Sequence, residues 1–296
     1  MIKREGYIHG VPCWIDTSQP DPPAAAEFYA ALFGWELEEM MPPEGPGHYI
    51  VGRLHGGDVA AVSSVPPGAP AMAMWNTYIW VDSADETTQK VAAAGGSVLT
   101  EPFDVMEAGR MAVLADPAGA VFCAWQAGAH KGANVVNEPG SLNFNVLNTT
   151  DLDGARSFYG AVFGWETLDL GGGGVLWTLP GYCDFLEQRD PGLRERMAAS
   201  GAPAGFEDVV ASLMPLTGDR AGTPPHWGVT FAVEDADATA ARASELGARI
   251  LVAPFDAPWV RMAVIADPQG AVFTASQYVP DNSGLAQDAG TTSGGS

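Results

Sequence analysis

Two kinds of spacing between apolar residues alternate along the chain. Helical spacing, with an apolar side chain every three or four positions, occurs at Ala25, Phe28, Tyr29, Leu32 and Phe33. Asp21 and Gly34 are the expected caps at the two ends of this helix. Shorter segments at 12–17, 35–41, 49–54 and 59–65 are separated by Pro- and Gly-rich turns, which predicts one strand before the helix and three after it. This order of elements is a βαβββ motif.

The same order recurs along the rest of the chain. The pattern predicts a strand at 76–81, a helix at 82–94 and strands at 98–99, 110–114 and 121–126. A strand at 142–147 and a helix at 151–162 then open a second half with the same arrangement. We therefore expect an α+β protein with four βαβββ motifs in two tandem domains.

Two repeated segments set the alignment of the halves. Residues 28–36 (FYAALFGWE) recur at 158–166 (FYGAVFGWE), an offset of 166 − 36 = 130. Residues 116–122 (DPAGAVF) recur at 267–273 (DPQGAVF), an offset of 267 − 116 = 151. A period of this size indicates duplication of a domain, not a solenoid. The offset rises by 151 − 130 = 21 between the two segments. This rise places an insertion of about 22 residues in the second half.

These offsets define the expected domains. The first covers 1–127, a linker 128–140, and the second 141–280, with the insertion near 188–215. The insertion is either a surface excursion or a flap over the second site, because long insertions are often functional. The tail at 281–296 consists almost entirely of small and polar residues, and we expect it to be disordered.

Composition narrows the possible partners. The net charge is −22 with only 14 Lys and Arg among 296 residues, which argues against nucleic acid and against anionic membranes. The three cysteines form no CxxC pair, and no apolar segment suggests secretion or membrane insertion. We expect a cytoplasmic protein whose partner is a small molecule. The two halves could pair within a monomer, or the chain could form a homodimer.

The four motifs, the repeated FYxxxFGW helices and the DPxG hairpins together resemble the vicinal oxygen chelate (VOC) superfamily. This superfamily includes glyoxalase I, bleomycin-resistance proteins and extradiol dioxygenases, and the chain is most similar to tandem glyoxalase-like proteins of the actinobacterial type. The resemblance covers about residues 8 to 279. It implies that each pair of motifs curls its strands into a cup that holds a ligand.

The resemblance also implies where a divalent metal ion would bind. The three ligand positions of the family fall on Trp14, Asn76 and Cys123 in the first cup, and on Phe144, Gly228 and Thr274 in the second. None is His or Glu, the usual ligands, whereas a hard cation needs several converging oxygen or imidazole ligands. We therefore expect no metal and no other cofactor, a departure from the family pattern.

Strand alternation predicts what the cups contain instead. The first cup is expected to present aromatic and polar side chains from Trp14, Asp16, Asn76, Tyr78, Trp80, Cys123 and Trp125. The second is expected to present smaller, hydroxylated walls with aromatic residues near its mouth: Phe144, Thr230, Thr274, Ser276, Trp177 and Trp259. Such side chains suit a planar organic ligand, but the aromatic ones could equally form a packed core.

Three charged residues are further candidates. Arg110 and Arg261 occupy equivalent positions before Met-Ala-Val, and each either binds a ligand carboxylate or pairs with a nearby carboxylate such as Asp104 or Asp256. Asp16 could act as a general base if its neighbours exclude water, although an exposed aspartate at a strand edge is commoner.

The sequence thus favours a VOC protein that binds an aromatic or hydrophobic metabolite and acts by sequestration in specialised metabolism or resistance. One alternative is a metal-independent or atypical enzyme, a lyase, isomerase or hydroxylase, acting on a natural product or an aldehyde. The other is a metal-dependent glyoxalase or dioxygenase. Fold resemblance alone does not choose among them.

Overall fold

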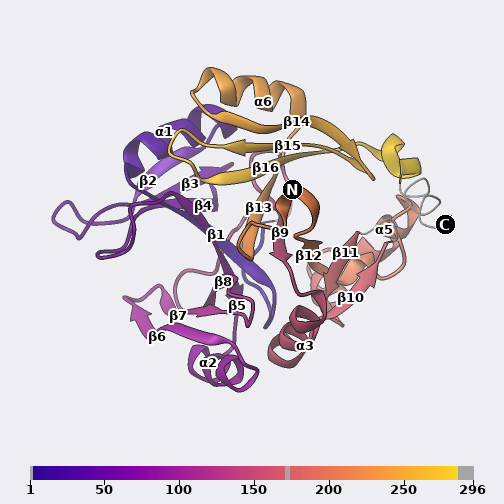
Figure 1. Ribbon diagram of the computed structural model, residues 1–296, viewed down its shortest axis with the longest axis horizontal. Coiled ribbons are helices and arrows are strands. Elements are labelled where there is room, and N and C mark those ends of the chain that lie inside the picture. Colours follow the sequence, from indigo (N-terminus) through magenta and orange to yellow (C-terminus); the bar gives the residue numbers. More distant parts are fainter. Residues whose placement is uncertain (1–2, 171–173, 286–296) are drawn as a thin grey trace. The chain divides into compact units, whose positions relative to one another are not determined.

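Two eight-stranded mixed sheets form the framework of the computed structural model, which describes residues 3–170 and 174–285 (Figure 1). The first sheet has the order β2 (Glu36–Glu39), β3 (Tyr49–Leu54), β4 (Gly57–Ser64), β1 (Pro12–Gln19), β5 (Met74–Trp80), β8 (Val121–Ala127), β7 (Gly109–Ala115), β6 (Ser97–Val105). The second repeats it as β10 (Glu166–Asp169), β11 (Val175–Thr178), β12 (Val209–Pro215), β9 (Leu142–Thr149), β13 (His226–Ala232), β16 (Val272–Tyr278), β15 (Val260–Ala266), β14 (Arg249–Ala257).

Each βαβββ motif contributes one main helix. These are α1 (Pro22–Phe33), α2 (Ala84–Ala93), α3 (Leu152–Phe163) and α6 (Ala236–Glu245). Parallel pairing of β1 with β4 and of β5 with β8, beside antiparallel hairpins, makes the first sheet mixed. The predicted fold class is confirmed: the protein is α+β, with four βαβββ motifs in two tandem halves.

The contacts of the chain divide it into two compact units, which are described one at a time. Unit 1 comprises the described residues within 1–13, 78–132 and 145–227, and unit 2 those within 14–77, 133–144 and 228–296. Each unit therefore combines segments from both halves of the sequence.

Helix α1 begins and ends as its sequence predicts. The Asp21 side chain accepts a hydrogen bond from the Ala24 amide at 3.2 Å, and Pro22 occupies the first turn, where no intrahelical donor is needed. Gly34 ends the helix with a φ of 75°, a left-handed conformation that glycine adopts without steric cost. Helix α3 has the same two kinds of cap, Asp151 and Gly164, but begins with Leu152 in place of a proline.

The repeated tyrosine joins the two halves of the sequence. In unit 2, the buried Tyr29 hydroxyl donates to Asp267 Oδ2 at 2.9 Å, and Gln19 Nε2 donates to the same oxygen at 2.7 Å. Asp267 Oδ1 accepts three backbone amides, those of residues 269, 270 and 271, at 2.7 to 2.9 Å. The FYxxxFGW helix of the first half is thus bonded to the DPxG hairpin of the second.

Unit 1 contains the reciprocal contact. The Tyr159 hydroxyl donates to Asp116 Oδ2 at 3.2 Å and accepts from Trp227 Nε1 at 3.0 Å. Asp116 Oδ1 accepts the amides of Ala118 and Ala120 at 3.0 and 2.9 Å. The repeated segments therefore form the core of both units through a buried hydrogen bond as well as through aromatic packing.

The two buried tyrosines are expected to make the free energy of unfolding fall at alkaline pH. Burial, reinforced by the neighbouring carboxylates, raises the pKa of Tyr29 and Tyr159 well above the ordinary value. Above about pH 10 the unfolded chain loses its phenolic protons while the folded chain keeps them, so the free energy of unfolding falls as pH rises. We expect the Tyr29→Phe, Tyr159→Phe double variant to lose stability less steeply between about pH 10 and 11 in urea unfolding. Identical slopes for variant and wild type would contradict this.

The extra segment of the second half lies between β11 and β12. It contains α4 (Tyr182–Glu187), α5 (Leu193–Ala199) and η1 (Phe206–Asp208), whereas β3 and β4 are joined by a tight turn. Strand β12 occupies 209–215, so the last seven residues of the range expected to be inserted form an ordinary strand. A groove of about 280 Å³ lies beside this segment, lined by Glu166, Thr167, Leu168, Thr178, Pro180, Gly205 and Asp208.

The remaining short elements are η2 (Gly218–Arg220) and η3 (Pro280–Gly284). Residues 281–284 of the expected disordered tail therefore belong to the 3-10 helix η3, while 286–296 lie outside the described residues. No helix in the described ranges combines the length and the apolar character needed to span a bilayer.

Candidate functional site

The first candidate residues lie on β1 in unit 2. Trp14 and Asp16 are 2% and 3% exposed, and both point away from the face of β1 that carries Ile15 into the hydrophobic core. Trp14 Nε1 donates to the Tyr49 hydroxyl at 2.9 Å. The expectation of an exposed strand-edge position for Asp16 is wrong, because the residues around β1 bury both of its faces.

The structure brings Asp16 together with Asn76. Asn76 Nδ2 donates to Asp16 Oδ1 at 2.8 Å and to Ser18 Oγ at 3.1 Å. A donor directed at the carboxylate stabilises its charged form and fixes its orientation. Sequence reasoning placed both residues on the same cup but missed Ser18 and Tyr49. Ser18 could have been found from strand alternation, because it follows Asp16 by two residues on β1. Tyr49 is the first residue of β3, after the turn.

A row of large side chains crosses four strands of unit 1. Pairing aligns Trp80, Trp125, Met111 and Phe103, and directly paired residues share a face of the sheet. The next row contains Tyr78, Cys123, Val113 and Thr100. Together these rows are called face A, and they lie opposite the side chains that pack toward helix α2. Sequence reasoning missed the contributions of β6 and β7 to this face.

Trp125 is the fixed centre of face A. Its Nε1 donates to the carbonyl oxygen of His130 at 3.2 Å, and its ring meets Tyr78 edge-on with centroids 6.2 Å apart. Gly109 makes room for this ring, since a Cβ there would lie 2.7 Å from Trp125 Cζ2. Trp125, Tyr78 and Cys123 are 5%, 8% and 5% exposed, so these side chains are packed as core in this conformation.

The matching surface of unit 2, called face B, has shorter side chains. One row contains Ala232, Ser276, Met262 and Phe255, and the other Thr230, Thr274, Val264 and Val252. The predicted hydroxyl-bearing residues Thr230, Thr274 and Ser276 therefore lie together. Met262 and Phe255 were missed, although the repeated segments PFD and RMAV at equivalent positions in both halves could have indicated them.

The other candidates of the second cup are dispersed. Phe144 is partly exposed near the start of β9, and Trp259 lies in the β14–β15 turn with a φ of 62°. Trp177 is fully buried in unit 1, within 5.5 Å of the rings of Tyr159 and Trp165 by centroid distance. Its expected position at the mouth of the second cup is therefore wrong.

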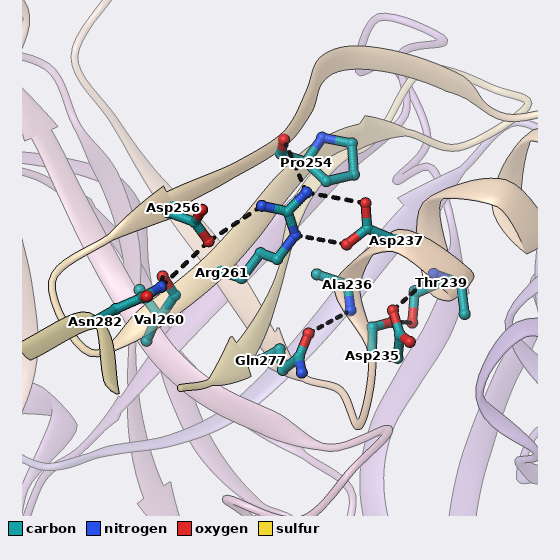
Figure 2. A network of polar contacts seen from close by, with 11 residues as sticks. Asp235, Ala236, Asp237, Thr239, Pro254, Asp256, Val260, Arg261, Gln277 and Asn282 are labelled. Atoms are coloured by element: carbon teal, nitrogen blue, oxygen red, sulfur yellow. Dashed lines mark hydrogen bonds and ion pairs between the residues drawn. The ribbon is translucent and has the colours of Figure 1, made fainter. Parts of the chain in front are cut away.

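Arg261 pairs with two carboxylates of its own unit. Figure 2 shows its guanidinium between Asp237 on α6 and Asp256 on β14. Nε and Nη2 donate to the two Asp237 oxygens at 2.5 and 3.0 Å, and Nη1 donates to Asp256 at 3.1 Å. The neighbouring Asn282 also donates to Asp256, at 3.2 Å.

Arg110 repeats this arrangement in unit 1. It binds both oxygens of Asp85 on α2, at 2.7 and 2.9 Å, and Asp104 at 3.0 Å. Both arginines thus point to the helix-bearing side of their strands, the opposite side from faces A and B. Of the two alternatives for these arginines, the structure shows ion pairs with nearby carboxylates. Neither guanidinium group is directed toward the candidate residues on faces A and B.

The side chains at the metal positions implied by the family do not fit a divalent ion. Trp14 offers an N–H donor, and the Asn76 amide nitrogen is bonded to Asp16 and Ser18. Cys123 is a soft ligand, and Phe144 and Gly228 have no donor atom in their side chains. Within residues 3–170 and 174–285, no group of three or more His, Cys, Asp and Glu side chains could hold a metal.

A family model and the curated relatives indicate the same protein family. A model described as "Glyoxalase/Bleomycin resistance protein/Dioxygenase superfamily" matches residues 14–124 and 141–274. The chain is 39% identical over 285 residues to "Putative glyoxylase CFP32" of Mycobacterium bovis, covering 95% of this chain and 99% of that protein. It is 36% identical over 284 residues to "Anthracycline biosynthesis protein DnrV" of Streptomyces peucetius, covering 90% and 93%.

Solved structures share the fold at low identity. The Mn(II)-bound glyoxalase from Novosphingobium aromaticivorans has a TM-score of 0.57 and 15% identity, covering 92% of this chain and 82% of that one. A mutant of 4-hydroxymandelate synthase from Streptomyces coelicolor has a TM-score of 0.54 and 12% identity, covering 99% and 100%. These similarities concern the architecture only.

Proposed function

Because the chain belongs to the glyoxalase/bleomycin resistance protein/dioxygenase superfamily, we propose that it binds a small aromatic or hydrophobic organic molecule without a divalent metal at the usual family positions. The observation that carries this proposal is the chemistry of those positions. Indole, amide, thiol, phenyl and hydroxyl groups, together with a glycine, replace the oxygen and imidazole ligands that a hard cation needs.

Specialised metabolism is the proposed setting. The relative from Streptomyces peucetius is named for the biosynthesis of an anthracycline, a class of fused-ring aromatic compounds, and the match extends over nearly all of both chains. Face B also combines the apolar side chains of Met262 and Phe255 with the hydroxyl groups of Thr230, Thr274 and Ser276, a composition that is typical of sites for flat organic ligands.

Sequestration is the simpler activity for such a site, since it needs only shape and polarity. One observation favours an enzyme as the second candidate. Asp16 is a buried carboxylate with an orienting donor, Asn76, at 2.8 Å, which is how a metal-independent general base is held. In that case Asp16 would remove a proton from a bound ligand, with no metal required.

The test is a titration with daunorubicin, an anthracycline, at about 0.3 M salt to screen the charge of −22. We expect saturable quenching of tryptophan fluorescence at one equivalent, equally strong after treatment with a chelator. Absence of saturable binding, or binding that depends on added Mn²⁺ or Zn²⁺, would overturn the proposal.

Mass spectrometry of the recovered probe separates the two candidates. Unchanged daunorubicin indicates sequestration. A product that forms with the wild type and is lost with Asp16→Asn, while binding persists, indicates an enzyme with Asp16 as its base.

A further inference from the structure

Faces A and B occupy equivalent positions in the two sheets but carry different side chains at their centres. The cross-strand pairs of β5, β6, β7 and β8 recur pair for pair in β13, β14, β15 and β16. Phe103, Met111 and Val113 on face A match Phe255, Met262 and Val264 on face B. The outer walls on the two edge strands thus differ only in Thr100 against Val252, which makes the differences at the centre informative.

Face A fills its centre with its own aromatic rings. Trp80, Trp125 and Tyr78 lie side by side there, and the Trp125 indole is held by the His130 carbonyl above the space that Gly109 leaves. The rings of Trp125 and Tyr78 are buried and that of Trp80 is partly exposed, so the centre of face A is packed with its own side chains, as in a core.

Face B lacks these three rings. Ala232, Ser276 and Thr230 occupy the positions of Trp80, Trp125 and Tyr78, and Thr274 occupies that of Cys123. The exchange removes two indoles and a phenol and adds three hydroxyl groups at the same places. The opposite side of these strands still packs tightly, with Phe231, Phe273 and Ala275 fully or almost fully buried.

On the basis of the proposed function, we infer that face B is the ligand-binding surface and that face A is structural. The ligand is a planar, fused-ring molecule with hydroxyl or carbonyl substituents. Its ring system takes the places on face B that Trp80 and Trp125 take on face A, and its substituents bond to Thr230, Thr274 and Ser276. Met262 and Phe255 form the apolar wall beside it.

Exposure along the row gives the direction of entry. Ser276 and Thr230 are each 6% exposed, whereas Phe255 on the edge strand β14 is 37% exposed. The ligand therefore reaches the hydroxyl groups from the β14 edge and passes Met262. Arg261 takes no part, because it is bonded to Asp237 and Asp256 on the other side of the sheet. Asp16 takes no part either, because β1 belongs to the first sheet, so a ligand on face B corresponds to sequestration and not to catalysis by Asp16.

The experiment fills face B with the residue that face A carries. Ala232→Trp places an indole where Trp80 stands in the other half, and we expect it to weaken daunorubicin binding at least tenfold. The matched variant Trp80→Ala gives face A the residue of face B, and we expect its affinity to stay within about twofold of the wild type. Circular dichroism and urea unfolding check that both variants are folded.

A smaller change covers the case in which Ala232→Trp does not fold. Thr274→Val removes one hydroxyl at nearly constant shape, and we expect affinity to fall about three- to tenfold, as for one lost hydrogen bond. Unchanged binding in Thr274→Val and in a folded Ala232→Trp, or a loss confined to Trp80→Ala, overturns the assignment to face B while leaving the proposed function intact. Failure of the wild type to bind is the separate outcome that removes the proposed function.

Discussion

Replacing Asp267 by alanine is expected to lower the free energy of unfolding by about 3–5 kcal/mol. The carboxylate is 4% exposed and accepts five hydrogen bonds, from three backbone amides, Tyr29 and Gln19. Alanine leaves all five donors without this acceptor, inside a region that water does not reach. The hairpin and helix α1 then lose the contact that joins the two halves of the sequence in unit 2.

Two variants make this expectation specific. Asp267→Asn keeps an oxygen for the backbone amides but directs an NH₂ group at the Gln19 amide, so we expect an intermediate loss of about 1–3 kcal/mol. Asp116→Ala, the equivalent change in unit 1, removes an acceptor with no glutamine partner and should cost less than Asp267→Ala. Urea unfolding followed by circular dichroism measures all three. Equal stability of Asp267→Ala and the wild type would show that the hydrogen bonds seen here contribute nothing.

The spacing of apolar residues was enough to predict the fold but not this contact. Both Tyr29 and Asp267 belong to segments that the repeat made conspicuous, yet the offset relates each to its counterpart, Tyr159 or Asp116, and not to its partner. The pairing depends on how the motifs of the two halves pack, which a linear period does not contain. The repeated phenylalanines Phe28 and Phe158 are 5% and 2% exposed, which indicates that they pack in the core.

The candidate site shows a similar division. Alternation on regular strands correctly placed Trp14 with Asp16, and Tyr78 with Trp80, on common faces. For β6 (Ser97–Val105) the sequence predicted only the strand at 98–99, because the register with β7 shifts between Val98 and Thr100 and again between Thr100 and Phe103. A strand with such irregularities loses its period of two, so Phe103 could not be assigned to a face from the sequence. The orientation of Arg110 also required the position of α2.

Gly52→Ala is expected to destabilise unit 2 by about 2–3 kcal/mol, although the same change in a strand interior is usually favourable. A Cβ at Gly52 would lie 2.4 Å from Trp35 Cε3 and 2.7 Å from Cδ2. Trp35 has no room to retreat, because its Nε1 donates to the Gly140 carbonyl at 2.8 Å and its ring stacks on Tyr29 at 5.5 Å. The added methyl group therefore strains the core that Asp267 anchors.

The control is Gly222→Ala. Beyond its chain neighbours, no atom of the described residues lies within 4 Å of the added Cβ, so we expect stability to stay unchanged or rise by about 0.4–1 kcal/mol. Replacing Trp35 by leucine in the Gly52→Ala background tests the cause, since removal of the indole removes the steric conflict. Urea unfolding of the wild type, the two single variants and the double variant measures this double-mutant cycle. Gly52→Ala should lower the free energy of unfolding less in the Trp35→Leu background than in the wild type. A penalty of the same size in both backgrounds would place the strain in the β3 backbone and not in the contact with Trp35.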